Sequence, residues 1–167
     1  KLRYPLSYNK LKKIVNNKII HLRRIAKYVI IDFNNYHSII IHLGMSGRLK
    51  INKTNKKRNK HEHLIFKFNN NSKLIYSDPR KFGFVDLIQS NRISNLTYIK
   101  KLGIDALDQK LSEDYLHKKI CKSNVMIKQI LLNQYIVAGI GNIYASEILF
   151  DAKISPLKKG NNLNKYQ

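Results

Sequence analysis

Hydrophobic residues recur in two different patterns, one before about residue 90 and one after about residue 103. In the first part they form short runs rich in Ile, Val, Phe and Tyr, separated by polar turn signals such as Asn34-Asn35 and residues 69–72. Runs of this length and spacing predict the strands of an antiparallel sandwich. The predicted strands cover residues 29–33, 38–43, 63–68, 73–77 and 84–89.

After about residue 103 the hydrophobic residues recur at helical spacing. Ser112 is the expected N-cap of a first helix, and Ser123 or Asn124 is the expected N-cap of a second. A third helix is expected to begin at Asn142 and to end before Pro156. The predicted helices cover residues 113–121, 125–132 and 142–151.

The two patterns together predict an α+β protein with two domains. An antiparallel β-sandwich domain is expected over residues 1–103, and the start of a helical domain over residues 104–167. A short linker is expected near residues 103–110. The lysine-rich segment 52–60 falls between two predicted strands and is expected to be a solvated loop.

The chain of 167 residues carries a formal net charge of +22, which points first to a polyanionic partner. Abundant Lys, Asn and Ile are also typical of an AT-rich genome, so compositional drift is an alternative source of part of this charge. No apolar run approaches the roughly 20 residues of a membrane span, and no secretory leader is evident. A single cysteine, Cys121, excludes an internal disulfide and suits a reducing compartment.

Met45, Arg80 and Phe82 form a set suited to entering a DNA base stack. An enzyme that acts on a base inside a duplex must turn that base out, at a cost of a few kcal/mol. A Met on a tight Gly-rich turn can fill the vacated position, an Arg can donate to the widowed base, and a Phe can wedge the neighbouring step. The alternative is that both segments are ordinary hairpin turns, with Met45 as core filler.

The segment Gly139–Asn142 opens the third predicted helix. Glycines let the backbone approach a phosphate closely, and free N–H groups at a helix N-terminus attract an anion. Asn142 can cap the helix or reach the phosphate itself. The alternative is that this glycine-rich turn only connects two helices.

In this order, three phrases of the sequence resemble the formamidopyrimidine-DNA glycosylase family: HLGMSG at residues 42–47, DPRKFG at 78–83 and GIGNIYASE at 139–147. Only Lys81 replaces the more usual Arg. The resemblance implies a DNA glycosylase and AP lyase that excises oxidised purines, such as 8-oxoguanine and formamidopyrimidines, and nicks the strand by β/δ-elimination. It also implies a helix–two-turns–helix domain. The implied partner is double-stranded DNA with oxidised purines or abasic sites, bound by a cytoplasmic, nucleoid-associated bacterial monomer.

The resemblance also implies roles for single residues. Met45, Arg80 and Phe82 match the residues that the family inserts into DNA. Lys27 matches an essential lysine beside the lesion phosphate, to which proton donation during strand cleavage is assigned. Ser123 stands where a further DNA-binding lysine is expected, and Lys122 is its expected substitute. The other DNA-backbone contacts implied are His61, Gly141 and Asn142.

Two histidines allow other interpretations. His61 and His63 have the spacing of a metal pair on one strand face, but no carboxylate or thiol set accompanies them, so no metal site is expected. His42, in the strand that leads to Met45, is expected to be a packed structural histidine.

The resemblance places this sequence in the middle of the family's length, and the chain does not begin with Met. The family's N-terminal proline nucleophile, its adjacent glutamate and its C-terminal four-cysteine zinc finger have no expected counterpart here. Residues 1–5 match a later strand, and the nitrogen of Pro5 is held in a peptide bond. No cofactor is therefore expected in this chain, and Zn²⁺ is implied only for the absent finger.

Three alternatives remain open at this point. The related endonuclease VIII group prefers oxidised pyrimidines, but DPRKF at residues 78–82 favours the purine enzymes. A second alternative is a non-catalytic binder of damaged or abasic DNA, a remnant of such an enzyme. A third is a basic nucleic-acid-binding protein of the ribosomal type, which would have no use for a set of residues that fills a base stack.

Overall fold

The computed structural model describes residues 4, 7–53, 59–164 and 166–167. Packing divides the chain into two compact units, one up to Ile93 and one over Ser94–Gln167, and each unit has its own core. The sequence pattern placed this division later, between residues 103 and 104. The division falls within η2 (Ser90–Asn95), and α2 (Thr97–Lys100) belongs to the second unit, whereas the pattern shows no helix in either segment.

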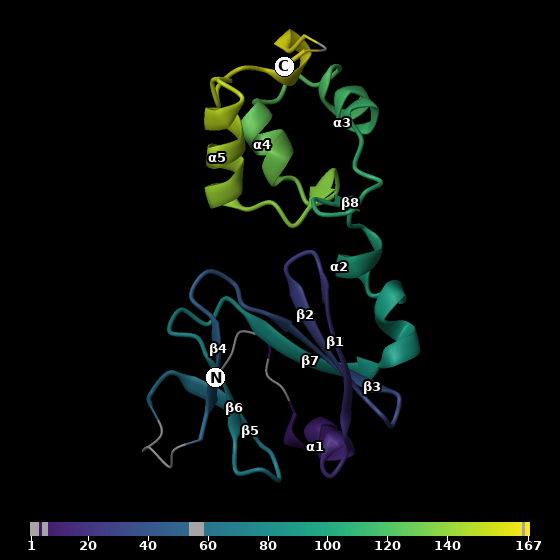
Figure 1. The fold of residues 1–167 in the computed structure, drawn as a ribbon, viewed down its shortest axis with the longest axis vertical. Helices are drawn as coiled ribbons and strands as arrows, with labels where there is room; N and C mark the ends of the chain where they lie inside the picture. Colours follow the sequence, from purple (N-terminus) through teal and green to yellow (C-terminus); the bar gives the residue numbers. More distant parts are fainter. Residues whose placement is uncertain (1–3, 5–6, 54–58, 165) are drawn as a thin grey trace. The chain divides into compact units, whose positions relative to one another are not determined.

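The β unit contains two antiparallel sheets (Figure 1). The first has the strand order β1-β2-β3-β7 and the second has the order β4-β6-β5. Two short helical segments, α1 (Tyr8–Leu11) and η1 (Lys12–Ile14), precede the strands. The predicted α+β class with antiparallel sheets is confirmed. The strands are β1 (Ile19–Ile25), β2 (Tyr28–Phe33), β3 (His37–His42), β4 (Arg48–Asn52), β5 (Glu62–Lys67), β6 (Lys73–Ser77) and β7 (Phe84–Gln89).

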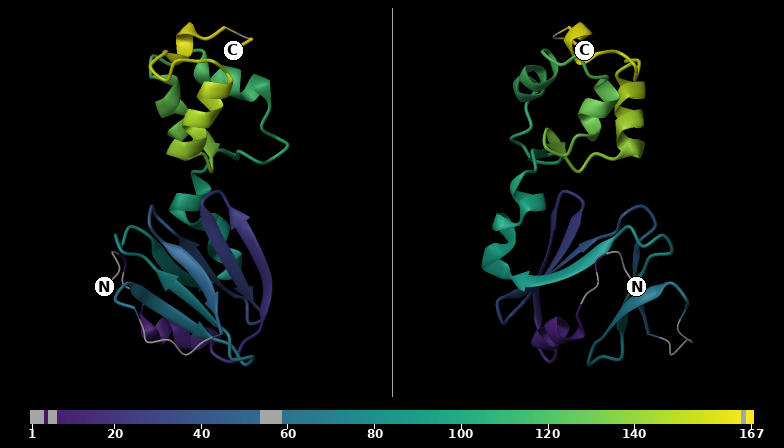
Figure 2. Two further views of the ribbon diagram at one scale, coloured as in Figure 1. Left: turned by 60° about the vertical axis from the view of Figure 1, so that its left-hand side comes forward. Right: turned by 180° about the vertical axis from the view of Figure 1, so that it is seen from behind.

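The core of the β unit lies between the two sheets, which form separate layers (Figures 1 and 2). Ile39 and Ile41 of β3 are fully buried in one cluster with Tyr76 of β6, which also has no exposed surface. Because side chains alternate between the faces of a strand, Ile39 and Ile41 both point into this cluster. The isoleucine-rich runs therefore supply the inner face of the first sheet.

Two strands, β1 and β4, have no counterpart among the predicted strands. In β1 every residue from Ile19 to Arg24 is exposed, since this strand lies at the edge of its sheet. An edge strand that buries little shows no alternation of apolar and polar residues, so its pairing with β2 could not be recognised from the pattern. β4 is short and is also an edge strand.

Two connections carry the chain from one sheet to the other, and they lie next to each other. Residues 43–47 link β3 of the first sheet to β4 of the second, and residues 78–83 return from β6 to β7. The strand pairs His42↔Phe84 and Arg48↔Ser77 bracket both connections. This topology brings together two segments that lie more than 30 residues apart in the sequence.

The helical unit packs around Ile127, Val137, Ala145 and Leu149. Its two short strands pair in parallel, and the second of them lies between two helices. The predicted linker near residues 103–110 contains the first of these strands, so part of it is held in regular structure. The elements of this unit, after α2, are β8 (Ile104–Asp105), α3 (Glu113–Ile120), α4 (Ile127–Leu132), β9 (Val137–Ala138), α5 (Asn142–Asp151) and η3 (Gly160–Asn162).

The predicted N-cap is correct for α3 and wrong for α4. Ser112 caps α3, because its Oγ accepts a hydrogen bond from the Tyr115 amide at 3.2 Å. The prediction for α4 was wrong, since Met126 occupies its N-cap position with no side-chain bond. Ser123 instead accepts from the Val125 amide at 3.2 Å, and Asn124 accepts from the side chain of Asn161 at 2.7 Å. These bonds hold the loop before α4.

Within the described part of the chain, no helix is both long enough and apolar enough to cross a membrane. The predicted loop at residues 52–60 falls largely on residues outside the described ranges, as does most of the segment 1–5.

Candidate functional site

The two connections between the sheets hold Met45, Arg80 and Phe82 close together. The backbones touch, since a Cβ atom added to Gly44 would lie 2.7 Å from the Gly83 nitrogen. Gly44 also has a φ of +63°, a conformation that favours glycine. Met45 is 67% exposed and Phe82 is 46% exposed, so both apolar side chains face solvent. The interpretation of Met45 as core filler is therefore wrong.

Asp78, which has no exposed surface, joins the two connections. Its carboxylate accepts hydrogen bonds from the Ser46 hydroxyl at 2.5 Å and from the Gly83 amide at 2.8 Å. Tyr76 donates to the same carboxylate at 3.3 Å. The Ser46 oxygen in turn accepts from the Arg80 amide at 3.2 Å. The sequence pattern treated Asp78 only as part of a turn, and its contacts show that it holds both turns.

Burial raises the pKa of the Asp78 carboxyl, but hydrogen bonds from Ser46, from the Gly83 and Lys81 amides and from Tyr76 outweigh this effect. The pKa of Asp78 therefore lies below its ordinary value. Burial also raises the pKa of Tyr76, and the neighbouring Asp78 charge raises it further. Asp78 is thus a charged acceptor and Tyr76 a neutral donor across the physiological range.

Asp32 is a second buried carboxylate of the β unit. Arg23 forms an ion pair with it at 2.6 Å, and the Ser38 hydroxyl also donates to it. Burial raises the pKa of Asp32, but the bonds from Arg23 and Ser38 lower it below its ordinary value. Both of these buried carboxylates, Asp32 and Asp78, are therefore stabilised in the ionised form.

We expect the β unit to lose stability as the pH falls below about 4, the ordinary value for Asp. The folded pKa values of Asp32 and Asp78 are depressed, so the stabilisation is complete above the unfolded value and is lost as the pH falls through the folded values. Urea unfolding between pH 7 and pH 3 measures this loss. A free energy of unfolding that stays constant over that range would contradict the expectation, and Asp32→Asn should weaken the pH dependence.

Arg80 and Phe82 form a pair within the second connection. The guanidinium carbon of Arg80 lies 4.8 Å from the centre of the Phe82 ring, which is a cation–π contact. Lys81, between them, has a φ of +60° and an exposed side chain. All three side chains are exposed.

His61 and His63 contact Asp78 through different atoms. The Asp78 amide donates to the His61 carbonyl at 3.0 Å, while the His63 ring bonds to the Asp78 carbonyl at 2.8 Å. His61 precedes β5, and the pairing of β5 with β6 is irregular between Glu62 and Leu64, so the two histidines do not stand on one regular strand. Among the residues with described positions, no group of three or more His, Cys, Asp or Glu is arranged to hold a metal ion.

Lys27 lies in the turn between β1 and β2, close to the end of β3. Its side chain is exposed, yet partial burial lowers the pKa of its amine. The pKa of His42 is also lowered, first by burial and then by the charge of Lys27. His42 accepts from the Gly44 amide at 3.1 Å and stacks on Phe84 with ring centres 5.8 Å apart, so the packing predicted for it is observed.

Removing the Lys27 charge should raise the pKa of His42. We expect Lys27→Ala to shift the titration of the His42 ring to higher pH, because one of the two effects that favour the neutral imidazole is lost. An NMR pH titration of the ring protons measures the shift. Lys67→Ala is a matched control. Lys67 is the last residue of β5, at the end of the second sheet away from the two connections, so its removal should leave the titration of His42 unchanged. Equal titrations of wild type and Lys27→Ala would show that the two groups do not interact.

In the helical unit, Gln134 shapes the turn that precedes α5. Its side chain accepts from the Gly139 amide at 2.9 Å and donates to the Ile140 carbonyl at 2.8 Å. Gly139 has a φ of +103°, and Gly141 occupies the N-cap position of α5 with no side-chain cap. α5 begins at Asn142, as predicted, and Asn142 is exposed; since Gly141 holds the N-cap position, Asn142 does not cap this helix. Gln134 was missed because a lone Gln carries no sequence signal for the turn that its side chain holds.

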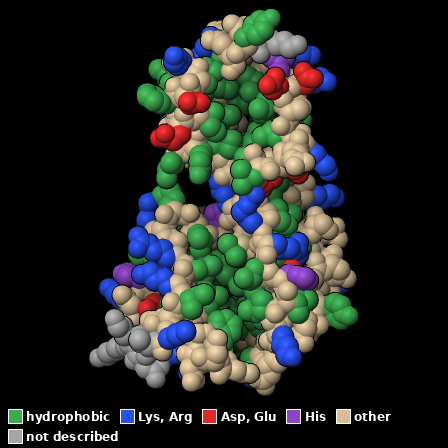
Figure 3. Space-filling view, in the orientation of Figure 1, with side chains coloured by type: hydrophobic (Ala, Val, Ile, Leu, Met, Phe, Trp, Pro, Cys, Tyr) green, Lys and Arg blue, Asp and Glu red, His purple; other side chains and the backbone are tan. Residues whose placement is uncertain are grey.

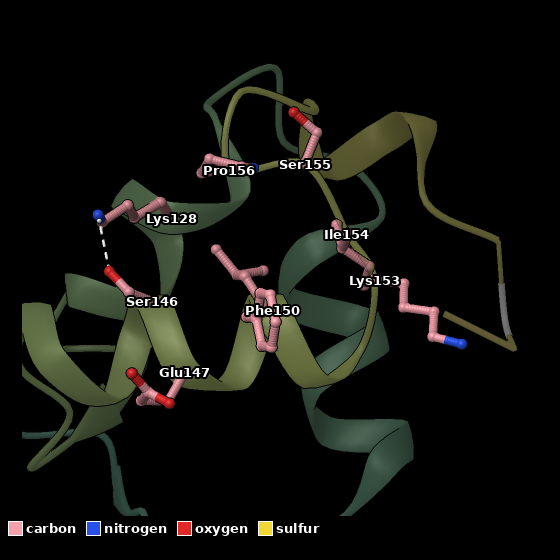
Figure 4. A pocket seen from close by; sticks show the side chains of 9 residues that line it. Lys128, Ser146, Glu147, Phe150, Lys153, Ile154, Ser155 and Pro156 are labelled. Carbon is pink, nitrogen blue, oxygen red and sulfur yellow. Dashed lines mark hydrogen bonds between the residues drawn. The ribbon is translucent and has the colours of Figure 1, made fainter.

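α4 and α5 are linked where Lys128 donates to the Ser146 hydroxyl at 3.0 Å (Figure 4). Ser146 in turn donates to the Asn142 carbonyl at 2.9 Å, so Lys128 is held near the start of α5. A hollow of about 610 Å³ lies beside this contact, with Glu147 and Phe150 on its α5 side. Lys122 is exposed just beyond the end of α3.

Lysine and arginine side chains are spread over the visible face of both units rather than gathered in one patch (Figure 3). This distribution fits the view that part of the charge is compositional.

Comparison with known proteins decides the family. Residues 1–85 match the model of the formamidopyrimidine-DNA glycosylase N-terminal domain, and residues 102–167 match that of the formamidopyrimidine-DNA glycosylase H2TH domain. The chain belongs to the formamidopyrimidine-DNA glycosylase family. The resemblance in the three motif phrases is thereby confirmed.

Relatives within the formamidopyrimidine-DNA glycosylase family are longer than this chain. The enzymes of Rickettsia bellii and Rickettsia canadensis are 45% and 44% identical to it, over 98% and 97% of this chain and 59% of their own length. The structure of Lactococcus lactis formamidopyrimidine-DNA glycosylase non-covalently bound to abasic-site DNA superposes with a TM-score of 0.89 at 35% identity. That match covers 99% of this chain and 65% of the solved one. The chain thus spans about three fifths of the curated relatives.

Proposed function

We propose that this chain is the lesion-recognition part of a base excision repair DNA glycosylase and AP lyase. Its substrate would be double-stranded DNA containing 8-oxoguanine, formamidopyrimidines or abasic sites. The observation that carries the proposal is the joint at Asp78, which presents Met45, Arg80 and Phe82 together on two touching turns. The alternative is a non-catalytic remnant that binds damaged or abasic DNA.

The exposed apolar side chains suit insertion into a duplex. Turning a base out costs a few kcal/mol, and burying Met45 and Phe82 would return roughly 1.5–3 kcal/mol each. The Arg80 guanidinium would donate to the Watson–Crick edge of the widowed base while its flat face stays on Phe82. The free energies of the two processes are therefore comparable, which makes base flipping by this set feasible.

The remaining residues are proposed to hold the DNA backbone and assist the chemistry. Lys27, with its lowered pKa, would donate a proton at the lesion phosphate during strand cleavage. Asn142 and the Gly141 amide, at the start of α5, would contact a lesion-strand phosphate. His61 and Lys122 are the further backbone contacts in this proposal.

Zinc is not part of the site proposed here. The family resemblance implies a zinc finger with four cysteines, whereas Cys121 is the single cysteine of this sequence and is half-buried. The residues described offer no set of ligands that fits the ion. The finger, like the proline nucleophile, is assigned in this proposal to polypeptide that the longer relatives have in addition.

The proposal is tested by mixing the chain with three duplexes, one undamaged, one with 8-oxoguanine opposite cytosine and one with an abasic site. Fluorescence anisotropy would give the affinities, and borohydride would trap any Schiff base in the same samples. We expect at least about tenfold tighter binding to the damaged duplexes, without trapping. Equal binding to all three would refute lesion recognition, whereas trapping would place the nucleophilic amine within these residues.

A further inference from the structure

We propose that Asp78 is a positioning residue that makes Met45 and the Arg80–Phe82 pair enter damaged DNA as one unit. The inference rests on the proposed function and adds a mechanism to it. Insertion of Met45 into the DNA depends on insertion of the Arg80–Phe82 pair, and the reverse. Asp78 itself has no exposed surface, so it would act only through the residues that it holds.

The position of Asp78 makes this coupling possible. The two connections leave the same pair of sheets in opposite directions, β3 to β4 and β6 to β7. Strand pairing holds their outer ends through His42↔Phe84 and Arg48↔Ser77, but it leaves the turns between them without ladder bonds. The Asp78 side chain occupies this unpaired corner and bonds to Ser46 of the first turn and to the Gly83 and Lys81 amides of the second.

A carboxylate is the group that this corner requires. Asp78 accepts from one hydroxyl and two backbone amides in the turns, and from the Tyr76 hydroxyl. All four partners are donors, so the position takes an acceptor with several lone pairs and no proton of its own. An asparagine would turn an N–H₂ group toward one or more of these donors and could not satisfy them all.

The turns have little room to move separately. A Cβ on Gly44 would lie 2.8 Å from the Phe82 carbonyl carbon, and one on Gly83 would collide with the His42 carbonyl oxygen. The Ser46 oxygen extends the link by accepting from the Arg80 amide. Displacement of the Met45 turn is therefore transmitted to Arg80 through Ser46 and through direct backbone contact.

Two single hydroxyl deletions separate positioning from mere stability. Ser46→Ala removes the donor that connects Asp78 to the Met45 turn, while Tyr76→Phe removes a donor to the same carboxylate that belongs to neither turn. Asp78→Asn is the more severe variant. Circular dichroism and thermal unfolding of each variant would establish that it is folded before binding is measured.

The readout is a double-mutant cycle between Met45→Ala and Arg80→Ala, with a duplex that carries a tetrahydrofuran abasic analogue opposite cytosine. In the wild-type background we expect the double loss of affinity to be smaller than the product of the single losses by about fivefold or more. In the Ser46→Ala background the loss of affinity in the double variant should equal the product of the two single losses to within about twofold. The Tyr76→Phe background should keep the coupling of the wild type.

Each outcome has a defined meaning. Independent losses in the wild type would overturn the inference, as would equal loss of coupling in Ser46→Ala and Tyr76→Phe, since that result indicates only general destabilisation. An undamaged duplex of the same sequence serves as the reference. If the wild type binds both duplexes equally, the proposed function fails as well, and this failure is visible before any cycle is measured.

Discussion

Gly44→Ala should destabilise the β unit by about 2–5 kcal/mol. Two costs add. A non-glycine residue at a φ of +63° is strained by about 1–2 kcal/mol, and the added Cβ would lie 2.7 Å from the Gly83 nitrogen, where overpacking costs a further 1–3 kcal/mol. Urea unfolding followed by circular dichroism measures the change.

Asn16→Ala is a matched control for Gly44→Ala. Asn16 has nearly the same φ, 62°, but lies exposed in a loop before β1. It should therefore cost only about 1 kcal/mol, since strain alone changes there. If the two variants lose equal stability, the contact between the connections contributes nothing, and the argument that the turns support each other is wrong.

Arg80→Ala should weaken binding to damaged duplex by about 10- to 100-fold, with a much smaller loss on undamaged duplex. A bidentate contact to a base edge contributes about 1–3 kcal/mol, and that edge is accessible only when its partner base has been turned out. The Arg80 side chain is exposed and held over Phe82, so its removal should not unfold the protein. Anisotropy titrations with paired damaged and undamaged duplexes measure both losses.

Lys81→Ala removes the same charge from the next residue and serves as the control for Arg80→Ala. Lys81 makes no ring contact with Phe82, so we expect a modest loss that is equal on damaged and undamaged duplex, as for a phosphate contact. Higher salt should reduce the contribution of Lys81 to the affinity equally for the damaged and the undamaged duplex. Equal losses on both duplexes for Arg80→Ala would instead make Arg80 a phosphate contact and would contradict base readout.

Much of the fold could be read from local pattern. The isoleucine-rich runs gave β2 and β3 to within a residue, and β6 and β7 have the predicted bounds. β2 and β3 are buried on both faces and appear as continuous apolar runs, while β7 alternates buried and half-buried residues. β1 exposes nearly every residue at the sheet edge, and no apolar period marks it. The caps of α4 differ for a related reason, because Ser123 and Asn124 bond to a loop that is close only in three dimensions.

The site was predictable in its exposed members and not in its supports. Met45, Arg80 and Phe82 stand in short motifs, and their chemistry suits one task. Gln134 and Asp78 act by accepting or donating hydrogen bonds that hold turns, and neither residue type by itself predicts such a role. Aspartate is a common first residue of a turn, so the sequence suggests only that role for Asp78. Its burial and its four hydrogen-bond donors identify it as the residue that links the two connections.

The sequence by itself determined five of the strands and the three longest helices, the basic charge, the exposed members of the site and, through three phrases, the family. The tertiary structure decided which of those side chains meet. Residues 45 and 80 come together because β3 pairs with β7 and β4 pairs with β6, so that both connections between the sheets cross at one corner. Pairing between strands distant in the chain depends on how all their faces pack at once, and no local stretch of sequence carries that information.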